Sequence, residues 1–107
     1  MKDDLLKILL HYGTKRQLKH WHSEVFELVE AVIDYMNLVD GDVIDVSTYV
    51  KEEEKRKNHI TEELADNFVM LKQFQHRFEI EDSEIEKIME EKIQRTLERM
   101  ENDYYDK

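Results

Sequence analysis

The amino-acid sequence predicts an all-α fold: an antiparallel bundle of three long helices plus a short N-terminal helix, in one domain spanning residues 1–107. Three observations support this fold class. The chain has no proline and two glycines among 107 residues, and 39% of its residues are charged. Apolar residues also recur at spacings of three and four, as along one side of a helix. Sheets need many turns, which this composition does not supply.

The first predicted helix covers residues 3–12. Asp3 and Asp4 suit its N-terminus, where the helix dipole favours negative charge, and Gly13 suits a left-handed C-terminal cap. Thr14 is expected to cap a second, longer helix that ends near Asp40-Gly41. The expected packing seam of this second helix consists of Leu18, Trp21, Val25, Leu28, Val32, Tyr35 and Met36.

Residues 41–48 (GDVIDVST) contain turn-forming and β-branched residues, and we expect a loop there, with a short strand as the alternative. Ser47 or Thr48 is expected to start a polar helical segment, KEEEKRKN, that continues into the third long helix. The expected seam of the third helix consists of Ile60, Leu64, Phe68, Leu71, Phe74 or Gln75, and Phe78.

The fourth helix is expected to open at Ser83, because Ser83-x-x-Glu86 matches a capping box. Its apolar positions are Ile85, Ile88, Met89, Ile93, Leu97 and Met100. The stripes of the three long helices are more than one thin layer of helices would cover. Self-association into a homodimer or homotetramer is therefore expected to complete the bundle.

Charge and cysteine content narrow the function classes. With 26 acidic and 16 basic residues, the net charge is −10, which argues against a nucleic-acid polymer or an anionic membrane as partner. The absence of cysteine excludes disulfides, thiolate metal sites and a cysteine nucleophile. The early apolar run is interrupted by Lys7 and preceded by Asp3 and Asp4, unlike a signal peptide, so a cytoplasmic protein is expected.

Two similar carboxylate motifs lie on the second and third predicted helices. They read His20-x-x-x-Glu24-x-x-Glu27 and His59-x-x-x-Glu63-x-x-Asp66. Residues three apart share a helix face, and these acids lie at the edge of the apolar seams. About a quarter of the chain is acidic, so such pairs also arise by chance, and a solvated acidic face is the competing interpretation.

Convergence of the four carboxylates would require a counter-ion. At a separation of about 5 Å they would repel by roughly 3 kcal/mol per pair at an effective dielectric of 20. Divalent cations would neutralise such a cluster, and all-oxygen ligation favours Mg²⁺, or Mn²⁺, over zinc. The two histidines leave zinc or iron open as a lesser option.

These motifs resemble those of the all-α nucleoside triphosphate pyrophosphohydrolases, which include MazG-like proteins and dimeric all-α dUTPases. The family signature, E-E-x-x-E followed by E-x-x-D, is similar to SEVFEL (23–28) and EELAD (62–66). HYGTKRQ (11–17) and NHITEELADNFVMLKQ (58–73) also resemble small bacterial or phage MazG-like proteins. Ser23 departs from the family's first glutamate, and Asn67 stands where an aliphatic residue is more common.

The resemblance implies Mg²⁺-dependent hydrolysis of a nucleoside triphosphate to the monophosphate and pyrophosphate. It implies metal ligation by Glu24, Glu27, Glu63 and Asp66. Glu30 and Glu62 are candidates to assist the attacking water, with a plain surface role as the alternative for each. The candidate residues for binding the base are Gln17, His20 and Trp21, although Trp21 also suits core packing. The candidates for binding the phosphates are Lys92, Arg95 and Arg99, with ion pairs inside their own helix as the alternative.

Two other functions remain open at this stage. One is a non-catalytic acidic helical module that binds a basic partner, and the other is a metal-storing or redox helical bundle. Release of pyrophosphate, a tight basic partner, or bound iron would distinguish the three.

Overall fold

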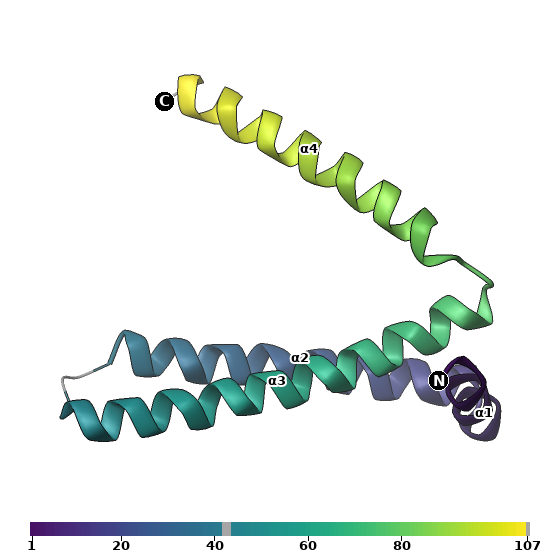
Figure 1. Cartoon of the computed structure of the whole chain (residues 1–107), viewed down its shortest axis with the longest axis horizontal. Coiled ribbons are helices and arrows are strands. Elements are labelled where there is room, and N and C mark those ends of the chain that lie inside the picture. Colours follow the sequence, from purple (N-terminus) through teal and green to yellow (C-terminus); the bar gives the residue numbers. More distant parts are fainter. Residues whose placement is uncertain (42–43, 107) are drawn as a thin grey trace. The chain divides into compact units, whose positions relative to one another are not determined.

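The computed structural model describes residues 1–41 and 44–106, the last three by their backbone alone. It contains four helices, α1 (Lys2–Tyr12), α2 (Thr14–Val39), α3 (Val46–Arg77) and α4 (Asp82–Asp106) (Figure 1). No strand occurs in these residues, which confirms the all-α class. Asp42 and Val43, in the predicted loop, lie outside the described residues. None of the described helices is long and apolar enough to cross a membrane.

The chain divides into two compact units, Met1–Phe74 and Gln75–Lys107, and the boundary falls inside α3. The first unit holds α1, α2 and most of α3. The second holds the end of α3 and α4. The three-helix bundle, the single domain and the oligomer stay predictions.

The corner between α1 and α2 is made by Gly13, which has φ 87° and ψ 149°. The positive φ was expected, but this ψ is extended rather than left-handed helical, and a side chain would be strained there. The Gly13 N–H still caps α1 by donating to the Leu9 carbonyl at 2.8 Å. Thr14 does not cap α2 as predicted, because it is already the first helical residue and Gly13 precedes it without a side-chain cap.

Two further helix starts differ from the prediction by a few residues. Helix α3 begins at Val46, before the expected Ser47 or Thr48, because the Asp45 carboxylate accepts from the Thr48 N–H at 2.9 Å and its hydroxyl at 2.7 Å. These hydrogen bonds hold the pKa of Asp45 below its usual value.

Helix α4 begins at Asp82 rather than at a Ser83 cap. The reciprocal half of its capping box is made by Glu84, whose carboxylate accepts from the Glu81 N–H at 2.8 Å. The predicted capping box of Ser83 and Glu86 is therefore wrong, because the observed hydrogen bond joins Glu81 and Glu84, two residues earlier.

Helices α2 and α3 form an antiparallel hairpin within the first unit (Figure 1). Contacts pair Gln17 with Gln73, and further along α2 they pair Tyr35 with Glu53. The seam on α2 follows a heptad pattern with alternating steps of four and three. It consists of the buried or half-buried residues Gln17, Trp21, Glu24, Leu28, Ala31, Tyr35 and Leu38.

This seam matches the prediction only in part. The predicted residues Trp21, Leu28 and Tyr35 of α2 are half-buried, as are Ile60 and Phe74 of α3. On α2 the expected Leu18, Val25 and Val32 are 39–46% exposed. On α3 the fully buried residues are Asn67, Met70 and Gln73, whereas Leu64, Phe68 and Leu71 are exposed. Part of the apolar stripe therefore lies beside the buried seam, and the polar side chains Gln17, Glu24, Asn67 and Gln73 share the seam with apolar ones.

In the second unit, α3 ends in a Schellman motif, although no glycine is present. The Ile80 N–H donates to the Gln75 carbonyl and the Glu79 N–H to the His76 carbonyl, with Glu79 at φ 55°. The apolar side chains Ile88, Met89, Ile93, Leu97 and Met100 of α4 are each about half exposed within the chain.

Candidate metal centre and adjoining cavity

Three carboxylates converge between α2 and α3. Glu24 of α2 and Glu63 and Asp66 of α3 each offer one oxygen, and these oxygens all lie within 4.8 Å of one another. Glu24 is 8% exposed, so one member is buried in the seam. Two helices thus bring together three of the four residues predicted as metal ligands.

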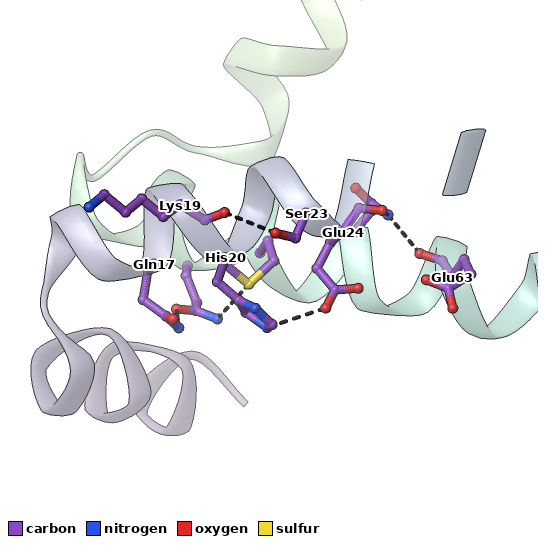
Figure 2. Close-up of polar contacts among 9 residues, drawn as sticks. Gln17, Lys19, His20, Ser23, Glu24 and Glu63 are labelled. Atoms are coloured by element: carbon purple, nitrogen blue, oxygen red, sulfur yellow. Dashed lines mark hydrogen bonds and ion pairs between the residues drawn. The ribbon is translucent and has the colours of Figure 1, made fainter. Parts of the chain in front are cut away.

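Each of the two glutamates has one oxygen engaged and one free. His20 Nε2 lies 3.3 Å from Glu24 Oε1, and Figure 2 shows the two side chains on one side of α2. His59 Nε2 lies 3.4 Å from Glu63 Oε1 in the same way. The second oxygens, Oε2 of both glutamates, are buried and have no hydrogen-bond partner. A buried acceptor without a partner is costly, which makes these two atoms candidates to face a bound cation.

The electrostatics of the cluster agree with this geometry. Burial raises the pKa of Glu24 above its ordinary value, and the negative charges of Glu27, Asp66 and Glu63 raise it further, against a smaller lowering by His20. The apo protein therefore resists ionisation of Glu24. A divalent cation would reverse that effect by neutralising the cluster.

Asn67 fixes the two helices at this point. Its Nδ2 donates to the Glu24 carbonyl at 2.9 Å and to the Glu63 carbonyl at 2.8 Å. One buried amide thereby ties the backbones that carry the two glutamates. Asn67 therefore has a specific structural role at this point of the seam.

A cavity of about 440 Å³ adjoins the carboxylates. Glu24, His20 and Asp66 line one end, and Gln17 and Gln73 form part of its wall. The remaining lining residues come from all three helices of the first unit and are Ile8, Tyr12, Arg16, Val69 and Met70. The Arg16 guanidinium lies 5.9 Å from the centre of the Tyr12 ring.

The other predicted site residues lie outside this cluster. Glu27 is exposed and is not among the three convergent carboxylates, although its charge acts on Glu24. Glu30 is exposed on α2. Glu62 is also exposed and lines a separate surface hollow together with His59. Their roles stay predictions.

Trp21 packs against Phe74, with ring centres 5.7 Å apart, and is not among the residues that line the cavity. This contact supports the packing interpretation over base stacking. Lys92, Arg95 and Arg99 are exposed on α4 in the second unit, and none forms an ion pair with another described residue. Phosphate binding by these three residues stays a prediction.

Sequence reasoning missed Tyr12, Arg16 and Gln73. A signal for Gln73 was present, because Gln17 precedes Glu24 by seven residues and Gln73 follows Asp66 by seven. Two heptad-spaced polar pairs on two helices indicate a polar seam.

Comparisons with known proteins leave the family open: no family model, no curated protein and no solved structure matches this chain.

Proposed function

We propose that this protein is a Mg²⁺-dependent nucleoside triphosphate pyrophosphohydrolase. The observation that supports it best is the pair of buried, partnerless oxygens of Glu24 and Glu63, beside Asp66 and at one end of a cavity. The cavity has room for a small organic ligand. If that ligand carries phosphates, the carboxylates alone would repel them. Both features together fit a ligand that arrives with a divalent cation.

The donor set fits Mg²⁺ or Mn²⁺. All three convergent ligands are carboxylate oxygens, which hard divalent cations prefer. The histidine nitrogens Nε2 of His20 and His59 are directed at Glu24 and Glu63, so they orient the carboxylates rather than add nitrogen ligands. This arrangement argues for magnesium over the zinc or iron alternatives.

In the proposed reaction, Glu24, Glu63 and Asp66 would hold the cation, with Glu27 as a fourth ligand from the next turn of α2. When bound, the ion would neutralise the phosphates and lower the pKa of the attacking water. Water adds to the α-phosphorus, the α–β bridging bond breaks, and monophosphate, pyrophosphate and one proton are released. Glu30 or Glu62 would accept that proton, and Lys92, Arg95 and Arg99 would hold the outer phosphates.

We further propose that a second copy of the chain covers the exposed apolar side chains of α2 and α4. Scattered single exposed apolar residues are normal, but Ile93, Leu97 and Met100 recur along one stretch of α4 and are 49–59% exposed. The mass in solution, measured by light scattering after size exclusion, is expected to be that of a dimer or tetramer. A monomer at micromolar concentration would contradict this part.

The direct test is a pyrophosphate-release assay with a panel of natural and modified nucleoside triphosphates, in Mg²⁺ and in Mn²⁺. We expect release from at least one substrate and a rise in melting temperature with millimolar Mg²⁺ in the absence of nucleotide. Glu63→Ala is expected to abolish both effects while leaving the helical circular dichroism spectrum intact.

The assay also decides among the alternatives. A metal-dependent rise in melting temperature without pyrophosphate release from any substrate would support a metal-binding helical bundle instead. No response to metal, combined with tight binding of a basic protein, would support the acidic interaction module. Either outcome would overturn the hydrolase proposal.

A further inference from the structure

The end of the cavity away from the carboxylates has a buried amide pair in its wall. Gln17 is 5% exposed and Gln73 is 1% exposed, and both line the cavity. Gln17 Nε2 donates to Gln73 Oε1 at 2.9 Å, and Gln73 Nε2 donates weakly to Met70 Sδ at 3.6 Å. Apolar side chains would fill such a helix seam without any need for matched partners. Two buried polar side chains at a cavity wall therefore suggest a polar ligand.

The pair lies at a distance that suits the base of a nucleotide. Gln17 is seven residues from Glu24 and Gln73 is seven from Asp66, which corresponds to a rise of about 10.5 Å along each helix. That span is comparable to the distance between the α-phosphate and the outer edge of the base in an extended nucleotide. Figure 2 shows Gln17, His20 and Glu24 along one side of α2.

The same cavity offers a surface on which a base can stack. The Tyr12 ring and the Arg16 guanidinium both line it, and they lie 5.9 Å apart. Aromatic rings and guanidinium planes are the usual stacking partners of nucleobases. The base-edge readers and the stacking surface thus occur together, away from the carboxylates.

We propose that the Gln17–Gln73 pair reads the edge of the base, an inference that rests on the proposed function. A glutamine amide carries an acceptor oxygen and two donor N–H groups, and rotating both amides reverses the hydrogen bond between them without losing it. As observed, the Gln17 oxygen is left for a ligand donor. In the reversed pair, the Gln17 N–H is left for a ligand acceptor. The site therefore accepts bases with an amino group or an oxo group at the edge that meets Gln17.

The test measures binding rather than turnover, with non-hydrolysable α,β-imido analogues of dCTP and dUTP in the presence of Mg²⁺. These two ligands differ at ring position 4, amino against oxo, and at the adjacent N3, which accepts a hydrogen bond in cytosine and donates one in uracil. We expect the wild type to bind them within about threefold of each other by calorimetry. Gln17→Glu, measured at pH 8, presents acceptors only and is expected to favour the dCTP analogue by about tenfold or more, since a buried acceptor facing an oxo group is left unpaired.

A second variant separates base reading from phosphate binding. Gln17→Met keeps the size of the side chain and removes its polar atoms, so affinity for both analogues should fall about fivefold or more. Affinity for inorganic triphosphate and for Mn²⁺ should stay within twofold. Gln94→Glu on α4, where the glutamine is exposed and contacts Glu98, is the matched control and should change neither preference nor affinity.

The outcomes distinguish this inference from the proposed activity. Equal binding of both analogues by Gln17→Glu, or parallel losses for nucleotides and inorganic triphosphate in Gln17→Met, would overturn the base-reading role even if the enzyme is active. Binding of neither analogue by the wild type would overturn it as well. Binding with the expected preferences but no pyrophosphate release would reject the hydrolase and leave the base site standing.

Discussion

The two ends of the α2–α3 seam differ in whether their acidic side chains have basic or hydroxyl partners. At the end near the α2–α3 turn, Arg56 is half-buried and lies 3.6 Å from Asp34 and 3.4 Å from Glu52, and it also donates to the Asp34 carbonyl at 2.8 Å. Glu53 accepts from the Tyr35 hydroxyl at 3.3 Å and lies 3.5 Å from Lys57. Each of these acids has a basic or hydroxyl partner.

At the other end, Glu24, Glu63 and Asp66 converge. Among the described residues, no lysine or arginine forms an ion pair with any of these three carboxylates. In the part of the chain that the structure describes, the basic groups that pair with the two glutamates are both histidines, and one oxygen of each glutamate has no partner. If acid-rich composition alone explained the cluster, the pairing found around Arg56 should recur here. The contrast argues that the unpaired end is arranged for a cation from solution.

The largest difference in activity should come from replacing one acid at each end of the seam with its amide. Asp66→Asn removes a ligand charge from the cluster, and pyrophosphate release should fall by roughly 10²–10³-fold, because the charge that holds the cation is weakened. Asp34→Asn is the matched change at the paired end and should leave the rate within about twofold. The measurement is kcat/KM at the lowest Mg²⁺ concentration that saturates the wild type.

Equal losses in the two variants would show that the contrast between the ends has no functional meaning. A circular dichroism spectrum with unchanged helix content in both variants is needed, so that the rates report on the site. Raising Mg²⁺ tenfold should recover part of the Asp66→Asn rate and none of any Asp34→Asn deficit.

The sequence was sufficient to predict the helices and all three convergent carboxylates, although it added Glu27, which is not among them. Composition and periodicity determine helix type, and acids three residues apart share a face whatever the tertiary packing. Alternate positions of the α2 seam were predicted wrongly, because Leu18 and Val25 are more apolar than Gln17 and Glu24, whereas Trp21 and Leu28 lie in the seam as expected. Which face becomes buried depends on polar contacts between helices, such as that of Asn67 with Glu24, and these are not visible in a hydrophobic pattern.

Helix starts show the same limit at a smaller scale. Ser47, Thr48 and Ser83 are all good caps by residue type, yet Asp45 and Glu84 make the observed hydrogen bonds. Several polar residues compete at each helix start, and loop geometry selects among them. Tyr12 and Arg16 could not be assigned to the cavity from the sequence, because their place depends on how α1 folds back at Gly13.

An intermediate effect is expected at Asn67, the amide that joins the two halves of the cluster. Asn67→Leu replaces the amide with an aliphatic side chain of similar size and removes both hydrogen bonds to the carbonyls of Glu24 and Glu63. The carboxylates should then be held less precisely, and Mn²⁺ affinity should weaken by roughly 10–100-fold, as is usual when a group that positions metal ligands is lost.

Titration of bound Mn²⁺ by electron paramagnetic resonance measures this directly and does not require turnover. Asn58→Leu changes an exposed asparagine nine residues earlier on α3; it is the matched control and should bind Mn²⁺ as the wild type does. Unchanged affinity in Asn67→Leu would mean that packing alone positions Glu24 against Glu63.

The smallest effect concerns stability without metal, and it should have opposite signs at the two ends. Glu24→Gln keeps the shape of the side chain and removes one of three repelling charges, so the free energy of unfolding at pH 7 should rise by about 1–2 kcal/mol. Arg56→Gln breaks ion pairs whose acidic partners are partly exposed and should lower it by a smaller amount, about 0.5–1 kcal/mol. Urea unfolding of both variants in the presence of a chelator measures the two changes.

The pH dependence gives this last contrast its mechanism. The pKa of Glu24 is raised in the folded protein, so the folded state holds the proton more tightly than the unfolded chain, whose value is near 4.5. The resulting stability is present below that pH and is lost as the pH rises through the raised pKa. The advantage of Glu24→Gln should therefore be small at pH 4 and grow towards neutrality. Saturating Mg²⁺ should reverse its sign, since the wild-type carboxylate then has the partner that the apo seam lacks. An advantage independent of both pH and Mg²⁺ would place its origin in packing instead of charge.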